Sequence, residues 1–242
     1  MMRLLLISSS TVHGYGYLDH PEPEIRSFLG ERKRVAFVPF ALHDHDGYAA
    51  KVRERLGLMG FDVEQVRGPS DIEGAEAVFV GGGNTFRLLK TLYETKVFDA
   101  VRAAVRGGIA YMGSSAGSNV AGPTIKTTND MPIVYPPTFD AFGFVPFQIN
   151  PHYLDADPGS THMGETREQR IVEFLEENDT PVVAIREGSA IRVEGGTVSL
   201  AGSRPARVFR RGAEPREVEP GVIPSFGEES GPSGGRSRSR PG

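Results

Sequence analysis

A serine flanked by small residues lies near the middle of the sequence, in Gly113-Ser114-Ser115-Ala116-Gly117. The apolar run Ile109–Met112 precedes it and a helix-compatible segment follows, the context in which Gly-x-Ser-x-Gly presents a nucleophile. Small neighbours are needed because the chain reverses sharply there and a bulky side chain would block the hydroxyl. Ser115 is therefore a candidate nucleophile. The motif alone predicts an ordinary strand-to-helix turn with a serine cap equally well.

A serine nucleophile needs a base, and one of the six histidines has a favourable position. His152 follows the expected strand Phe147–Asn150, so that a loop could hold it over the edge of a sheet. On position alone, catalysis and a structural role explain His152 equally well. The run His43-Asp44-His45-Asp46 offers two histidines without a third ligand nearby, which favours a solvated loop over a metal site.

Two acidic residues could orient such a histidine and stabilise its charged form. Asp130 lies between Ser115 and His152 in the sequence, and Glu187 follows the expected strand Val182–Ile185. The alternative for each is a loop carboxylate that caps a turn. The residues alone do not choose between Asp130 and Glu187.

A glycine turn follows another expected strand, as Gly81-Gly82-Gly83-Asn84-Thr85 after Val80. Its backbone N–H groups could hold an anion or a developing oxyanion at the start of a helix. Glycine turns with an Asn or Thr cap are also common for purely structural reasons. The turn lacks the further glycine of a dinucleotide-binding fingerprint.

The composition indicates one sizeable α/β domain. The chain has 242 residues, a formal net charge of −4 and no cysteine, so we expect a single domain over residues 1–224 and a disordered Gly/Ser/Arg-rich tail over 225–242. The acidic balance argues against nucleic acid as a partner, and the apolar runs are shorter than a membrane span. We expect a cytoplasmic protein, since the apolar start of the chain is better explained as a first buried strand than as a signal peptide.

Short aliphatic runs alternate with amphipathic segments, a pattern that predicts a parallel sheet with helices on both faces. The segment Gly122–Pro146 is rich in Pro and Gly, and we expect long loops that line a site there. Gly195-Gly196 between two apolar runs predicts a C-terminal β-hairpin. The expected strands and helices are Leu4–Ser9, Val35–Phe40, Phe61–Val66, Ala77–Val80, Ile109–Met112, Phe147–Asn150, Val182–Ile185, Ile191–Val193, Val198–Leu200, Val208–Arg210 and Glu217–Val218 as strands, and Tyr48–Met59, Phe86–Tyr93, Val97–Val105 and Arg167–Glu177 as helices.

Four blocks of the sequence resemble peptidase E, the α-aspartyl dipeptidase family of serine exopeptidases. The resemblance spans roughly Met2 to Gly212, and the blocks taken together are highly specific for that family. It implies a flavodoxin-like fold similar to that of class I glutamine amidotransferases. The blocks are Val80–Lys90, Gly113–Gly117, Pro123–Val134, and Gln148–His152 continuing to Gly164–Arg170.

The resemblance also implies roles for individual residues. Ser115 matches the family's nucleophile and His152 its general base. Asp130 and Glu187 both match residues associated with the active site, and we expect Asp130 to be essential and Glu187 to orient the histidine. The resemblance further implies an oxyanion hole formed by the backbone N–H groups of Gly83 and Ala116, substrate binding by Arg167 and Asn84, and neither a metal nor a cofactor.

We therefore expect hydrolysis of dipeptides or short peptides with an N-terminal aspartate, through an acyl-enzyme on Ser115. The expected partner is a small peptide, with a homo-oligomer left open. One alternative is a cyanophycinase-like hydrolase of the same superfamily, acting on an aspartyl–arginine polymer. The other is a catalytically silent binding module, against which the presence of both Ser115 and His152 argues.

Overall fold

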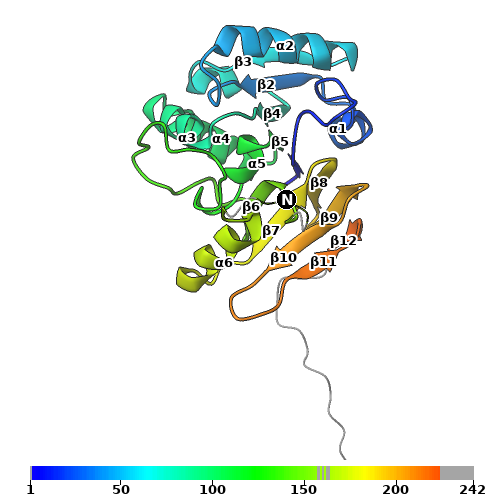
Figure 1. Cartoon of the computed structure of the whole chain (residues 1–242). Helices are drawn as coiled ribbons and strands as arrows, with labels where there is room; N and C mark the ends of the chain where they lie inside the picture. The colour runs from blue at the N-terminus through cyan, green and yellow to red at the C-terminus, as the bar shows by residue number, and fades with distance from the viewer. Residues whose placement is uncertain (1, 157–158, 160, 162–163, 224–242) are drawn as a thin grey trace, which may run out of the picture.

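A computed structural model describes residues 2–156, 159, 161 and 164–223 of the chain. The tail predicted to be disordered, residues 225–242, lies outside the described residues, and so does His162. Figure 1 shows strands and helices alternating along the first half of the chain and strands dominating the last third.

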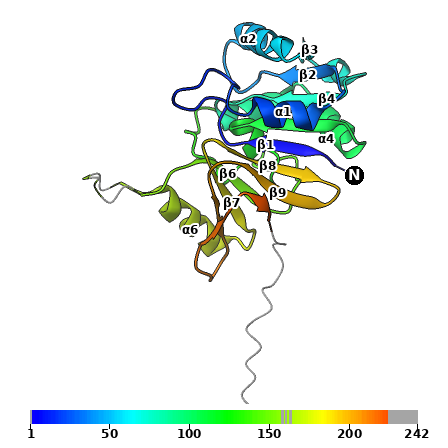
Figure 2. The same ribbon diagram turned by 90° about the vertical axis from the view of Figure 1, so that its right-hand side faces the viewer.

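A large sheet of eight strands forms the centre of the molecule, in the order β12-β9-β8-β1-β5-β4-β2-β3 (Figures 1 and 2). The run from β1 to β3 is parallel, whereas β8, β9 and β12 pair antiparallel. This confirms the α/β class and the mostly parallel sheet. The strands are β1 (Leu4–Ile7), β2 (Arg34–Val38), β3 (Asp62–Gln65), β4 (Ala77–Val80), β5 (Ala110–Ser114), β8 (Ser189–Glu194), β9 (Thr197–Gly202) and β12 (Gly221–Val222).

Helices cover both faces of this sheet, as the alternation of segments predicts. Along β1, Leu5 and Ile7 pack in one apolar cluster with α1 (Glu22–Leu29) and α2 (His45–Leu58). Leu4 and Leu6 point to the opposite face, into a second cluster with α3 (Thr85–Glu94) and α4 (Val97–Arg106). The short helix α5 (Ala116–Asn119) follows β5, and a 3₁₀ turn, η1 (Pro69–Ile72), precedes β4.

A second sheet was not predicted as a separate unit. It has four strands in the order β11-β10-β7-β6, of which β6 and β7 are parallel. The helix α6 (Arg167–Glu177) packs on it through Ile171 and Leu175, next to Val182 and Phe209. The strands are β6 (Gln148–Tyr153), β7 (Val182–Arg186), β10 (Ala206–Phe209) and β11 (Arg216–Val218).

One local turn was predicted correctly from the sequence, and one helix was missed. The hairpin β8–β9 turns at Gly195 and Gly196, whose φ angles of 60° and 86° suit the turn of a two-residue hairpin. Helix α1 was missed because its start is rich in proline, yet Pro23 lies in its first turn, where a proline removes no helical hydrogen bond.

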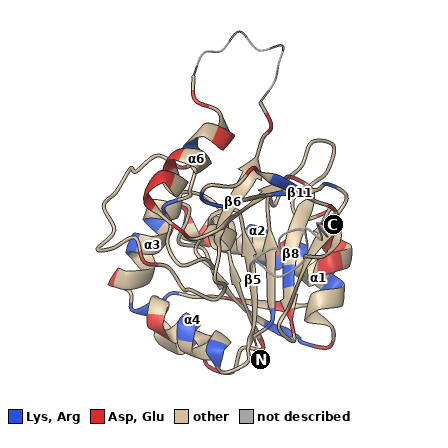
Figure 3. Cartoon of the chain, turned by 90° about the horizontal axis from the view of Figure 1, so that it is seen from below, with Lys and Arg blue, Asp and Glu red and all other residues tan. Residues whose placement is uncertain are grey.

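Charged residues gather on the helices and the outer strands, and leave β5 without charge (Figure 3).

Candidate active site

Ser115 lies in the sharp turn between β5 and α5. Its φ of +53° is uncommon for a residue other than glycine, and its backbone N–H donates a hydrogen bond of 3.0 Å to the carbonyl of Ile7 on β1. The motif glycine at Gly117 is required by space, because a Cβ atom there would come within 2.0 Å of the Val80 carbonyl oxygen. The sequence pattern thus corresponds to a tight turn at the carboxyl end of the central strands.

His152 comes from the second sheet. We expected it in a loop after the strand, but it lies within β6, at an irregularity in the β6–β7 pairing between Asn150 and Tyr153. Its φ is +55°, and an extra residue at such a bulge re-aims the side chain. Its backbone N–H donates to Ser8 Oγ at 3.0 Å, and Ser8 in turn donates to the Ile185 carbonyl at 2.8 Å. Ser8 therefore joins β6 and β7 to the carboxyl end of β1.

A hydrogen-bonded chain joins serine, histidine and glutamate. His152 Nε2 lies 2.8 Å from Ser115 Oγ, and His152 Nδ1 lies 2.8 Å from Glu187 Oε1. A carboxylate can only accept, so Nδ1 carries the proton and Nε2 is left to accept from the serine hydroxyl. This is the geometry that a nucleophilic serine and its general base require.

Asp130 makes contacts of a different kind. Its Oδ2 accepts from the backbone N–H of Thr85 at 2.7 Å, from the Thr85 hydroxyl at 2.6 Å and from the Thr128 hydroxyl at 3.2 Å. The aspartate therefore fixes the first turn of α3 to the loop after α5. The structure brings Glu187 into contact with His152 and places Asp130 at this helix terminus. Whether Asp130 is essential stays a prediction.

The backbone N–H groups of Gly83 and Ala116 have no hydrogen-bond partner among the described residues. Ala116 directly follows the nucleophile, and Gly83 belongs to the glycine turn after β4. The turn packs closely on the nucleophile, since a Cβ atom at Gly82 would lie 3.0 Å from Ser115 Cβ. The expected oxyanion residues thus flank Ser115 with unused donors.

Tyr48 on α2 supports the glycine turn and was not singled out from the sequence. Its hydroxyl oxygen accepts from the Gly82 N–H at 2.9 Å, and its ring packs edge-on against Phe37, with centroids 5.0 Å apart. The residue is buried, and burial raises the pKa of its hydroxyl. The helical spacing indicated only that Tyr48 faces the core, so no sequence signal pointed to this contact.

The two expected substrate-binding residues differ in their availability. Asn84 caps α3: its Oδ1 accepts from the Arg87 N–H at 3.0 Å and its Nδ2 donates to the Met131 carbonyl at 2.9 Å. Arg167 is the first residue of α6, and its guanidinium has no hydrogen bond or ion pair within the part of the chain that the structure describes. Burial lowers the pKa of its guanidinium, as does Arg170, while the charge of Asp130 raises it.

A cleft of about 480 Å³ opens beside the nucleophile. Its lining comes from Ser115, His152, the glycine turn, α2 and the segment after β1. The histidine-rich run 43–46 starts α2 rather than forming a loop site, and there Asp44 accepts from the Gly47 N–H at 2.9 Å as the helix cap. The described residues that line the cleft are Ser9, Ser10, Thr11, Tyr17, Leu42, Asp44, Gly47, Tyr48, Lys51, Gly82, Gly83, Ser115 and His152.

The fold and this arrangement define a class of enzyme: a hydrolase with an α/β sheet that presents a serine nucleophile at the carboxyl ends of its strands. Comparison with known proteins then fixes the family. The model of peptidase family S51 matches residues 4–201, and the chain belongs to that family. The resemblance to peptidase E is confirmed.

Individual relatives agree. The chain is 58% identical over 224 residues to a protein of Streptomyces coelicolor named Peptidase E, covering 91% of this chain and 92% of that one. It is 49% identical over 224 residues to a Drosophila melanogaster protein named "Probable alpha-aspartyl dipeptidase", with 90% and 93% covered. A solved structure of a peptidase from an acI-B1 Actinobacterium shares the fold at a TM-score of 0.68 and 16% identity, covering 92% and 96%.

Among the described residues, no helix has the length and apolar character needed to cross a membrane.

Proposed function

We propose that the protein hydrolyses dipeptides with an N-terminal aspartate, with Ser115 as nucleophile, His152 as general base and Glu187 as the residue that orients the histidine. The observation that carries the proposal is the hydrogen-bonded chain from Ser115 Oγ through His152 to Glu187. Relatives named Peptidase E and "Probable alpha-aspartyl dipeptidase" support the substrate class. The cytoplasmic location expected from the sequence stays a prediction.

The chemistry follows from this geometry. His152 Nε2 accepts the hydroxyl proton as Ser115 Oγ attacks the scissile carbonyl carbon, and Glu187 stabilises the imidazolium that forms. The N–H groups of Gly83 and Ala116 donate to the oxyanion of the tetrahedral intermediate. When the C–N bond breaks, Nε2–H passes its proton to the leaving amine. A water molecule then attacks the acyl-enzyme by the same route and releases aspartate.

Arg167 is our candidate for the residue that binds the aspartyl side chain of the substrate. Its guanidinium is half-buried and has no partner among the described residues, so it is available to a substrate carboxylate. A guanidinium grips a carboxylate through two parallel hydrogen bonds, which gives both energy and geometric selectivity. The neighbouring Asp130 is occupied by Thr85 and Thr128, and we propose that it positions Arg167 and the start of α3.

The test is hydrolysis of Asp-Leu by the purified protein without added metal, measured by the release of free aspartate. Wild-type protein should release it and Ser115→Ala should not, with the two proteins unfolding at the same temperature. Ser27→Ala is a matched control, because that serine is exposed on α1 and lies outside the proposed machinery. Undiminished activity of Ser115→Ala would refute the proposal, and an assay on aspartyl–arginine polymer tests the cyanophycinase-like alternative.

A further inference from the structure

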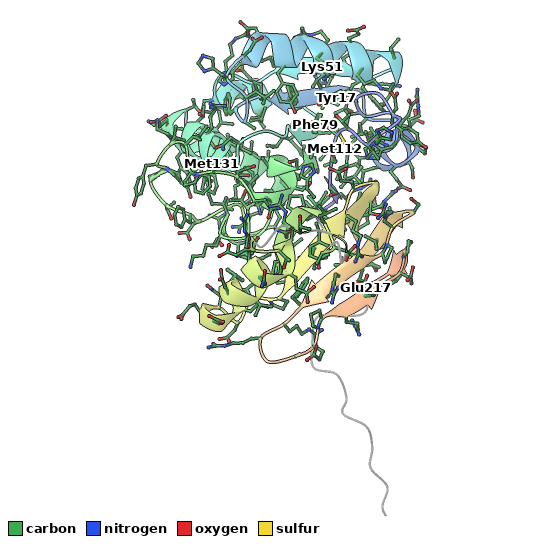
Figure 4. The ribbon with its side chains drawn as sticks, viewed as in Figure 1. Tyr17, Lys51, Phe79, Met112, Met131 and Glu217 are labelled. Atoms are coloured by element: carbon green, nitrogen blue, oxygen red, sulfur yellow. The ribbon has the colours of Figure 1, made fainter. Side chains whose placement is uncertain are left out.

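The cleft beside the nucleophile contains a cation that the reaction described above does not use. Lys51 is the only Lys or Arg among the described residues that line it. It lies on α2, three residues beyond Tyr48, and therefore projects from the same face of the helix as the tyrosine that holds the glycine turn. Figure 4 shows Lys51 and Tyr17 close together above the central strands.

The ammonium group is held in place but not neutralised. Lys51 Nζ lies 4.3 Å from the centre of the Tyr17 ring, within the range of a cation–π contact. Within residues 2–156, 159, 161 and 164–223 it has no ion pair. The one carboxylate among the lining residues, Asp44, is engaged as the cap of α2. The positive charge thus remains free for a ligand.

The position of the general acid indicates which part of a substrate enters this cleft. His152 protonates the leaving amine, so the residue that leaves departs on the side of His152. The cleft includes His152, whereas Arg167, Asp130 and Asn84 are absent from its described lining. On the proposed function, the aspartyl residue binds at Arg167, outside this lining, and the leaving residue enters the cleft that Lys51 lines.

We propose that Lys51 binds the α-carboxylate of the leaving residue and so selects dipeptides over longer or blocked peptides. This inference rests on the proposed function. In a dipeptide, that carboxylate lies directly after the scissile bond; in a longer peptide a neutral amide replaces it. Ser10 and Thr11 also line the cleft and offer hydroxyl groups to the same anion. Selectivity for chain length then arises from one charged contact.

The experiment compares two substrates that differ only at this group, Asp-Leu and Asp-Leu-amide, by release of aspartate. Wild-type protein should favour Asp-Leu in kcat/KM. Lys51→Met should lower kcat/KM for Asp-Leu on the order of tenfold, the effect of one hydrogen bond to a charged group, and leave Asp-Leu-amide unchanged. Lys51→Arg should retain part of the preference because it keeps the charge.

Lys33→Met is the matched control. Lys33 is exposed just before β2, at the amino ends of the parallel strands and therefore at the far end of the sheet from Ser115. It should leave the ratio of the two substrates unaltered. If Lys51→Met slows both substrates equally, or neither, the carboxylate site is refuted while the peptidase assignment stands. If wild-type protein cleaves neither substrate, the proposed function fails, and this subsite with it.

Discussion

Replacing Glu187 by glutamine separates the two acids considered for the active site. The change keeps the size of the side chain and removes the negative charge of Glu187, whose Oε1 lies 2.8 Å from His152 Nδ1. A hydrogen bond to a charged group contributes about 1.5–3 kcal/mol, which corresponds to roughly a 10- to 150-fold change in rate. Because the side chains of His152 and Glu187 are 37% and 49% exposed, we expect an effect far below the roughly ten-thousandfold loss known for a buried triad.

The assay is steady-state hydrolysis of Asp-Leu, with kcat and KM measured separately. Glu187→Gln should lower kcat and leave KM nearly unchanged, because the charge acts on the imidazolium that forms during attack. Asp130→Asn is the comparison: it weakens an acceptor shared by Thr85 and Thr128, so it should lower the free energy of unfolding as well as activity. If kcat of Glu187→Gln stayed within twofold of wild type, the role of the Glu187 charge in stabilising the imidazolium would be wrong.

Two further substitutions test the glycine turn and the aspartyl side of the site. Tyr48→Phe leaves the Gly82 N–H without its partner and should lower kcat about tenfold with KM unchanged. Its control is Tyr93→Phe, because the Tyr93 hydroxyl donates to the Asp140 carbonyl, outside the active site. An unaltered kcat in Tyr48→Phe would contradict the positioning role of Tyr48. Arg167→Gln should reduce the preference for Asp-Leu over Ala-Leu roughly thirtyfold, which corresponds to about 2 kcal/mol. The control Arg170→Gln should retain the preference. An unchanged preference in Arg167→Gln would mean that another group binds the aspartyl side chain.

The sequence predicted individual elements better than their assembly. Ala77–Val80 and Arg167–Glu177 have the predicted bounds, because an aliphatic run forms the strand and a capping box at Thr166 and Gln169 starts the helix. The second sheet could not be foreseen, since a buried apolar run indicates a strand but not its neighbour. Strand β7 pairs with β6 and β10 rather than with the large sheet, which only the three-dimensional packing decides.

The same limit applies to the site. Ser115 and His152 could be predicted as site residues because the motif, the position after a strand and the resemblance pointed to them. Glu187 contacts His152 because it follows β7, which pairs with β6. This pairing cannot be read from the residues alone, so they did not choose between Asp130 and Glu187. Lys51 lies in an amphipathic helix, where an exposed lysine is ordinary, and its place in the cleft depends on how α2 packs on the sheet.

The nucleophile and the base come from different sheets, Ser115 from the end of the large sheet's β5 and His152 from β6 of the smaller one. During synthesis on the ribosome, the serine emerges well before β7 and Glu187, without which β6 has no parallel neighbour. The chain topology thus brings Ser115, His152 and Glu187 together only after β7 and the residue that follows it have been made.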